Sequence, residues 1–303
     1  LMAHIDKPSL HFNTKLYTAN NGTQSITGVG FQPDWTWIKC RTQSYNHALF
    51  DSVRGATKLI RSNQNNAEET HSTTLTAFDS DGFSLGGNDA FTNNGSETYV
   101  SWNWKAGNSA GSTNNDGSVT STVSANTTAG FSICKFDFPS SGNFTFGHGL
   151  GVAPRMFILR GYTGTANWQV YHQGLGNTYN TQLNFDSATS TAANWWGSTS
   201  PTSTVCTVGA DLIESGQTAI AYCFAEKPGY SKIGMYTGNG NADGAFVYTG
   251  FKPAFILVKN TSNSQSWYLL DVKRDTSNPM RTYLFADGTS GDQDHVFFDF
   301  YSN

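Results

Sequence analysis

The sequence GFQPDWTWIKCR at residues 30–41 decides the fold, because two later stretches repeat its pattern: GVAPRMFILR at 151–160 and GFKPAFILVK at 250–259. Each stretch reads glycine, an apolar residue, a variable residue and proline, followed by an apolar run that a basic residue closes. The basic residue lies six positions after the proline in every copy. A repeat of this kind sets the whole architecture. The sequence therefore predicts three copies of one structural unit.

A second apolar run follows each copy after a polar turn: HALFD, WQVYH and WYLLD. Its last residue lies twelve positions after the basic residue in all three copies. Two short apolar runs joined by a polar turn are typical of a β-hairpin. We therefore expect Pro33, Pro154 and Pro253 at equivalent positions before equivalent strands.

Two of the copies also share a closing strand, which reads TYVSWNWKAG at residues 98–107 and TAIAYCFAEKPG at 218–229. Both segments are rich in aromatic and β-branched residues that alternate with others, as strands do. The strand is centred 69 positions past the proline in the first copy and 68 in the second. The same distance in the third copy leads past Asn303, so the sequence predicts an incomplete third unit.

The repeat divides the chain into modules at residues 1–107 (with an N-terminal extension), 130–228 and 229–303. Residues 108–129 contain no aromatic residue and are mostly Ser, Thr, Asn, Gly and Ala, which is typical of a linker. Glu, a common residue of surface helices, occurs only five times, and only residues 52–70 could hold a short helix. We therefore predict an all-β fold of three tandem antiparallel β-sandwich modules, jelly-roll-like, with the third truncated or completed by another segment.

Composition excludes several functions. Charged residues make up 13% of the chain, aromatic residues make up 14%, and the net charge is −4. Lys and Arg are scattered, so no phosphate-binding surface and no nucleic-acid partner are expected. No apolar run approaches the roughly 20 residues of a membrane-spanning helix. The four cysteines form no CxxC pair, which favours free thiols over a zinc site, although a Cys206–Cys223 disulfide stays open.

The chain resembles the repeated-module structural proteins of tailed bacteriophages, notably phages of marine bacteria, over about residues 12–301. The resemblance rests on FNTKLYTANNGTQSITGVGFQPDWTWIKCR, GHGLGVAPRMFILR and YSKIGMYTGNGNADGAFVYTGFKPAFILVK, together with WQVYH, PTSTVCTVG and AYCFAEKPG. It implies concanavalin-like or LamG-like sandwich modules. It also implies a virion component, assembled in the cytoplasm of the bacterial host, in a tail fibre, a tail or a capsid decoration.

The resemblance implies a noncatalytic role in particle assembly. The expected partners are other virion proteins and symmetry-related copies, and analogy with fibre proteins suggests a homotrimer. Two alternatives stay open: a host-attachment module that binds surface glycan, and a glycan depolymerase. Because a sheet that lacks a strand exposes an edge, we also expect extensive contacts around residues 283–301 with a symmetry mate, another virion protein or a continuation of the chain.

The sequence offers little for catalysis. Retaining glycosidases need two carboxylates about 5 Å apart, and sandwich-fold glucanases place them at i and i+4 of one strand. None of the five Glu residues has an acidic residue four positions further on, and no GxSxG elbow occurs. His148 and His172 are interpreted as a turn and a strand histidine bonded to backbone. We assign no catalytic residue and no cofactor.

Two turns offer the oxygen ligands that calcium prefers. One contains Asp79 and Asp81, and the other contains Asn239, Asn241 and Asp243. Asx turns explain both strings without a metal, so these residues are candidates only and no metal site is assigned.

Two further motifs concern charge and aromatic residues. Asp51 and Arg54 in DSVRG recur as Asp271 and Arg274 in DVKRD, and we expect a structural ion pair that holds the turn after the second strand. The Trp195–Trp196 pair lies in a loop-like stretch, where exposed aromatic side chains stack on sugars or anchor interfaces. Burial of one of the two in the core is the alternative.

Overall fold

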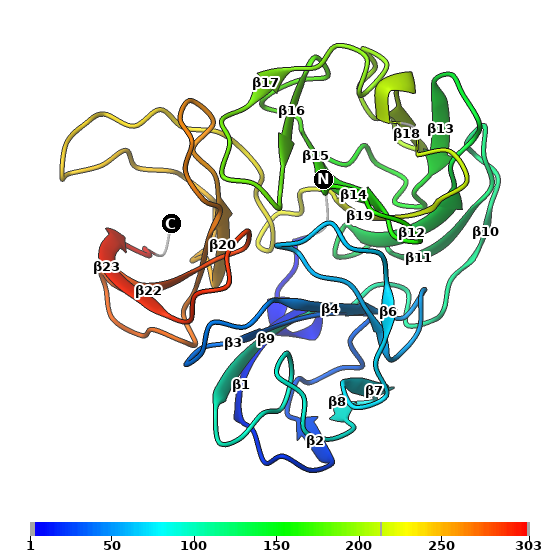
Figure 1. Cartoon of the computed structure of the whole chain (residues 1–303). Helices are drawn as coiled ribbons and strands as arrows, with labels where there is room; N and C mark the ends of the chain where they lie inside the picture. Colours follow the sequence, from blue (N-terminus) through cyan, green and yellow to red (C-terminus); the bar gives the residue numbers. More distant parts are fainter. Residues whose placement is uncertain (1–3, 213, 302–303) are drawn as a thin grey trace.

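The computed structural model describes residues 4–212 and 214–301, which form three groups of strands arranged around a common centre (Figure 1). All paired strands run antiparallel, and within the described residues the only helical segments are two short 3-10 turns, at Pro8–Leu10 and Ala210–Leu212. The predicted all-β class is therefore confirmed. The helix considered for residues 52–70 is absent, and two short strands form there instead.

Unit 1 (residues 4–107) is built on a four-stranded sheet in the order β1-β9-β3-β4. A three-stranded sheet in the order β2-β8-β7 and the short pair β5-β6 complete the unit. The bounds are β1 (Phe12–Thr18), β2 (Gln24–Thr27), β3 (Trp35–Cys40), β4 (Ala48–Asp51), β5 (Lys58–Leu59), β6 (Glu69–Thr70), β7 (Leu75–Asp79), β8 (Gly82–Leu85) and β9 (Thr98–Trp104). Buried Ile26, Phe50 and Phe83 belong to one core cluster, which includes residues of both sheets.

Unit 2 (residues 108–228) repeats this arrangement inside an eight-stranded sheet, β10-β11-β12-β19-β14-β15-β16-β17, beside a two-stranded sheet, β13-β18. The four strands β12-β19-β14-β15 correspond to β1-β9-β3-β4. The bounds are β10 (Ser112–Asn114), β11 (Ser121–Asn126), β12 (Phe131–Asp137), β13 (Phe144–Gly147), β14 (Met156–Gly161), β15 (Gln169–His172), β16 (Tyr179–Gln182), β17 (Ser190–Thr191), β18 (Val205–Val208) and β19 (Thr218–Phe224). Residues 108–129 differ from the expected linker, because they supply β10 and β11 to this sheet.

Unit 3 (residues 229–301) has a single four-stranded sheet in the order β20-β21-β22-β23. The bounds are β20 (Phe255–Val258), β21 (Tyr268–Asp271), β22 (Met280–Phe285) and β23 (Gln293–Phe298). Among the described residues, β20 pairs only with β21, whereas its counterparts β3 and β14 each pair with a closing strand as well. Within the described residues, the outer edge of β20 therefore has no partner strand.

The three hairpins share one register. Trp35 pairs with Asp51, Met156 with His172, and Phe255 with Asp271. Each first strand begins two residues after its repeat proline, so the predicted equivalence of the three prolines is confirmed. The repeat glycine has φ of 88° at Gly30, 71° at Gly151 and 81° at Gly250, a region that glycine enters without strain. The pattern therefore encodes a left-handed turn that leads into a strand.

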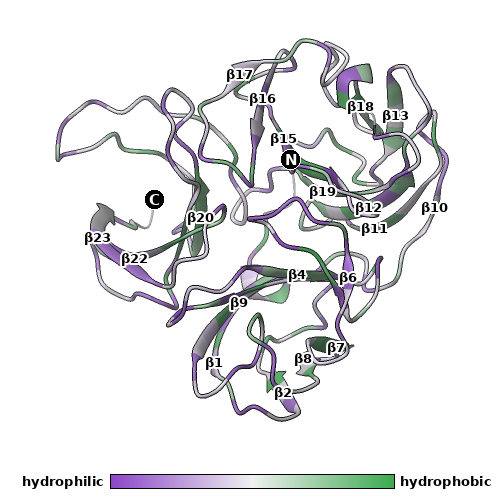
Figure 2. Cartoon of the chain, viewed as in Figure 1, coloured by the Kyte–Doolittle hydropathy of each residue, from purple (hydrophilic) through white to green (hydrophobic). Residues whose placement is uncertain are grey.

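One hydrophobic core lies between the units. It contains Trp35 and Trp102 of unit 1, Tyr222 of unit 2 and Leu269 of unit 3. Alternate side chains of a strand point to opposite faces, so in β9 Trp102 enters this shared core while Tyr99 enters the core of unit 1. The hydrophobic colour in Figure 2 accordingly falls mainly on the strands, and many outer loops are hydrophilic. Residues of all three units thus share one hydrophobic cluster.

Candidate interaction site

Polar contacts join the three units in a closed ring. The residue eight positions after the basic residue that closes each repeat donates from a ring nitrogen to a backbone carbonyl of another unit. The contacts are Trp168 Nε1 to the Arg61 carbonyl (2.7 Å), Trp267 Nε1 to the Gln182 carbonyl (2.8 Å) and His47 Nε2 to the Phe285 carbonyl (2.8 Å). Burial lowers the pKa of His47 well below its usual value, so the ring is neutral. Trp37 Nε1 donates to His47 Nδ1 at 2.8 Å, so the proton of the ring is on Nε2. Unit 2 thus contacts unit 1, unit 3 contacts unit 2, and unit 1 contacts unit 3.

The basic residue that closes each repeat is turned inward. Lys39 and Arg160 are buried, and burial lowers the pKa of Lys39 to about 8. Arg160 donates to backbone carbonyls of unit 1, including that of Asn66 at 2.5 Å, and Lys259 Nζ donates to the Asp186 carbonyl of unit 2 at 3.0 Å. Lys39 Nζ instead donates to the Cys40 carbonyl of its own unit at 2.7 Å, so Arg160 and Lys259 serve unit boundaries and Lys39 holds its own turn.

The two predicted ion pairs form and are fully buried. Arg54 Nε lies 2.5 Å from Asp51 Oδ2, and Arg274 Nε lies 2.5 Å from Asp271 Oδ2. In both cases the carboxylate also accepts from the backbone N–H of its arginine, which holds the turn after the second strand. This is the structural role that the sequence predicted for the recurring motif.

The same carboxylates bind closing strands of other units, which the sequence analysis missed. Asp51 Oδ2 accepts from the Tyr222 hydroxyl at 2.8 Å, and Asp271 Oδ2 accepts from Trp102 Nε1 at 3.1 Å. The signal was available, because Trp102 and Tyr222 occupy equivalent positions and both carry a polar tip. Each ion pair therefore fixes a turn and a unit boundary together.

The two histidines of unit 2 lie where the sequence predicted. His148 is buried; its Nε2 lies 3.1 Å from the Thr202 carbonyl, and its Nδ1 accepts from the Leu150 N–H. His172 takes the place of Asp51 in the repeat, and its Nδ1 accepts from the Gly174 N–H at 3.1 Å. Burial lowers the pKa of both rings. Both are bonded to backbone.

The calcium candidates are engaged by the protein itself. Asp81 accepts from the N–H groups of Gly30 and Gly28, and these bonds lower its pKa. Asp79 accepts from the Ser84 hydroxyl. Asn239, Asn241 and Asp243 hydrogen-bond to one another across their turn. Among the described residues, no group of three or more His, Cys, Asp or Glu is arranged to hold a metal.

Of the alternatives for the tryptophan pair, burial of one tryptophan in the core is the one that the structure shows. Trp196 is fully buried, packs against Phe157 and Tyr171, and donates from Nε1 to the Tyr179 carbonyl at 2.9 Å. Trp195 is half-buried against the same core of unit 2. Trp196 is therefore removed from contact with a sugar or a partner. The four cysteines are free and buried, so the disulfide left open for Cys206 and Cys223 does not form.

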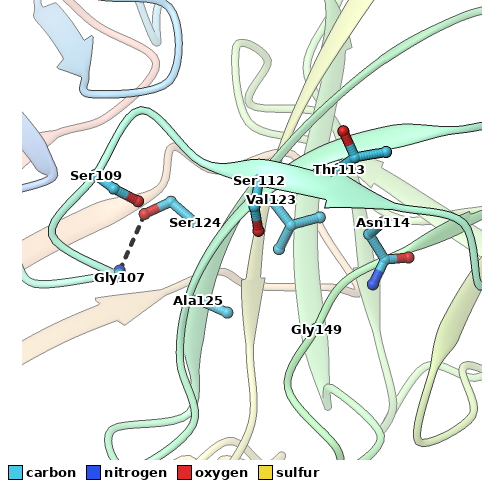
Figure 3. Close-up of a pocket in the computed structure, with 9 residues that line it drawn as sticks. All are labelled: Gly107, Ser109, Ser112, Thr113, Asn114, Val123, Ser124, Ala125 and Gly149. Carbon is cyan, nitrogen blue, oxygen red and sulfur yellow. Dashed lines mark hydrogen bonds between the residues drawn. The ribbon is translucent and has the colours of Figure 1, made fainter.

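A shallow pocket of about 280 Å³ lies beside β10 and β11, next to the boundary of units 1 and 2 (Figure 3). Its lining consists of small and polar residues without a titratable side chain: Gly107, Ser109, Ser112, Thr113, Asn114, Val123, Ser124, Ala125 and Gly149. The Gly107 N–H donates to Ser124 Oγ at 3.0 Å across one end. The pocket offers no acid, base or nucleophilic pair for chemistry.

The most unusual surface lies in unit 3. Large apolar side chains are exposed along residues 233–250, and the exposed fractions are 50% for Met235, 48% for Tyr236, 67% for Phe246 and 67% for Tyr248. This segment, here called the apolar strap, contains no strand. In Figure 1 it forms the long yellow loop opposite β22 and β23. An exposed apolar concentration of this kind marks a surface for interaction.

The fold and these contacts define an all-β repeat protein whose three units close around a shared core. The family model of a domain of unknown function, DUF7483, matches residues 7–303, and the chain belongs to that family. The match spans all three units, in agreement with their common core. The comparisons with curated proteins and with solved structures gave no match. No helix in the described part of the chain is long and apolar enough to cross a membrane.

Proposed function

We propose that the protein is a noncatalytic structural component of a tailed-phage particle, in a tail fibre, a tail or a capsid decoration, and that it acts through protein–protein contact. The observation that carries this proposal is the apolar strap in a unit whose edge strand β20 has, among the described strands, β21 as its one partner. Such a surface favours association with a polypeptide. The three units are, in this proposal, diverged copies of one jelly-roll-like sandwich module.

The use of the buried polar groups supports an assembly role. The ion pairs at Asp51 and Asp271 and the inward cations Lys39 and Arg160 hold turns and unit boundaries. Burial raises the pKa of Glu214 to about 7, but the charged neighbour that acts on it is Arg160 and not a second acid. A glycan depolymerase would use a pair of carboxylates, and no second acid acts on Glu214.

The direct test is to purify particles of the phage that encodes the chain, identify their proteins by mass spectrometry, and locate the chain with gold-labelled antibody. We expect a fixed copy number and label on the particle surface. Recovery of the chain from the infected lysate but not from washed particles would contradict the proposal. Release of oligosaccharide from host polysaccharide by the purified chain would point to the depolymerase, and glycan-array binding without release to host attachment.

A further inference from the structure

The closing strand is the central element of units 1 and 2. In unit 1, β9 pairs with β1 on one side and with β3 on the other. In unit 2, β19 pairs in the same way with β12 and β14. Unit 3 has no described strand in this position, so the outer edge of β20 is left without a partner strand. The described residues therefore contain two filled examples of a position that no described strand fills in unit 3.

The apolar strap matches segments that are buried in the other units. Phe246 lies seven residues before its repeat proline, as Ile26 of β2 does, and Phe146 of β13 lies eight residues before Pro154. The exposed fraction is 3% for Ile26 and 0% for Phe146, but 67% for Phe246. Met235 and Tyr236 correspond likewise to the ends of β1 and β12. The strap thus resembles two buried strands of the other units in its apolar residues. Among the described residues, unit 3 has no closing strand against which the strap could pair.

We propose that unit 3 is an acceptor for a β-strand from outside residues 1–303, which pairs with β20 as β9 pairs with β3. This inference rests on the proposed assembly role and names the kind of partner. The occupant is a seven-residue peptide strand, antiparallel to β20. Its alternate side chains are aromatic or β-branched, as Val100, Trp102 and Trp104 are in β9, and they enter the shared core. The side chains between them are small or polar.

The residue at the centre of the occupant can be specified further. Tyr222 stacks on Trp35 at 4.2 Å and bonds to Asp51. The equivalent residue of a strand in unit 3 would contact unit 2. There the repeat places Met156 at the position of Trp35 and His172 at the position of Asp51. Because Nδ1 of His172 accepts from backbone, the proton of the neutral ring is on Nε2. A tyrosine hydroxyl accepts from Nε2, whereas a tryptophan N–H does not, so tyrosine fits the centre best.

A second copy of the chain is the competing occupant. Its two strands with the required pattern, β9 and β19, are already paired on both edges. A copy could fill the position only by opening one of its own complete units, which would expose the shared core. The surface therefore favours a separate strand over self-association through intact units.

The experiment uses the chain of residues 1–303 and a fluorescent peptide with the sequence of β19, in which the cysteine is replaced by serine. Binding is followed by anisotropy, and hydrogen exchange is followed at β20. We expect saturable binding, slower exchange at residues 255–258, and weaker binding when the central tyrosine of the peptide becomes phenylalanine. A peptide of the same composition with scrambled order should not bind, because its apolar residues no longer share a face.

Two matched variants locate the site. Phe246→Asp changes a side chain that is already exposed, so folding should be kept, and peptide binding should weaken at least about tenfold because the strap no longer covers the strand. Phe185→Asp changes an exposed phenylalanine of unit 2 and should leave binding within about twofold.

Either of two results would overturn the proposal. The first is no binding together with unchanged exchange at β20. The second is a concentration-dependent dimer that the peptide does not disrupt, which would assign the surface to a second copy. This test is independent of the test on particles. Peptide binding by a chain that is absent from particles would support the acceptor and contradict the virion role. A chain that is present in particles but does not bind the peptide would support the virion role and contradict the acceptor.

Discussion

At the scale of single residues, the buried ion pairs carry the clearest consequences. Asp51→Ala leaves the buried Arg54 guanidinium with Glu68 as its one described carboxylate and removes the acceptor of the Tyr222 hydroxyl. Removal of one partner of a buried pair costs about 3–5 kcal/mol. We therefore expect the free energy of unfolding, measured by urea titration, to fall by about that amount.

A matched control separates burial from charge pairing. Arg281 and Asp294 form an ion pair whose side chains are 53% and 68% exposed. Solvent screens such a pair, so Arg281→Ala should leave the urea midpoint unchanged within error. Equal losses for Asp51→Ala and Arg281→Ala would contradict the structural role of the buried pair.

Glu214 gives stability a pH dependence. Burial raises its pKa to about 7, and its Oε2 and Gln217 Oε1 are buried acceptors without a described donor, both next to Gly161. A proton on Glu214 supplies a donor. The folded chain thus holds this proton more tightly than the unfolded chain, so the stabilisation is complete below pH about 4.5 and is lost as the pH rises through about 7.

The test compares Glu214→Gln with the unchanged chain by urea unfolding from pH 4.5 to 8. The difference between the two proteins isolates Glu214, because the buried histidines are common to both. The unchanged chain should lose stability relative to the variant as the pH rises. A constant difference across this range would show that the carboxyl titrates alike in the folded and unfolded chains.

At the scale of elements, hairpin equivalence could be predicted because spacing alone sets the register of Trp35 with Asp51 and of Phe255 with Asp271. The strand β11 could not be predicted, because residues 108–129 have the composition of a linker although Ser121 and Ser124 of this strand are buried. Burial of Trp196 depends on Phe157 and Tyr171, which lie far from it in sequence. The local sequence pattern therefore predicts the pairing of strands that are adjacent in sequence better than it predicts burial by residues that are distant in sequence.

The same distinction applies to the candidate site. The ion pair of Asp51 with Arg54 is local and was predicted, whereas its bond to Tyr222 joins residues 171 positions apart. The sequence also placed the incomplete edge around residues 283–301. The two complete units place the vacant position beside β20 instead, on the opposite side of the sheet from β23. Contacts of residues 283–301 with a partner stay a prediction.

The ring of unit contacts makes a prediction for three tryptophans. Trp168→Phe leaves the buried Arg61 carbonyl without its indole donor, and Trp267→Phe leaves the Gln182 carbonyl with the Phe185 N–H at 3.4 Å. The indole nitrogen of buried Trp35 has no described partner. All three changes remove the same volume. An unsatisfied buried group costs about 1–3 kcal/mol, so Trp168→Phe should lose about that much more stability in urea than Trp35→Phe, and Trp267→Phe should lose less than Trp168→Phe. Equal losses in all three would show that the ring contributes nothing beyond packing.

At the scale of the whole molecule, the shared core couples the units. Trp35, Trp37, Trp102 and Trp104 of unit 1 are each at most 8% exposed, and they pack in one cluster with residues of units 2 and 3. Complete burial of a large apolar side chain contributes about 1.5–3 kcal/mol, so the four together approach the whole stability of a small domain. Unit 1 alone would present them to water.

We therefore expect the isolated segment 1–107 to fail to fold or to associate, with tryptophan emission shifted to the red relative to residues 1–303. The complete set of units should unfold in one calorimetric transition, because the loss of any unit uncovers the core of the others. The apolar strap should exchange its amides first, ahead of β12 and β19, since it is exposed and forms no strand. A segment 1–107 that unfolds cooperatively with buried tryptophan emission would show that the repeats are separate domains and that the core between them forms only after each has folded.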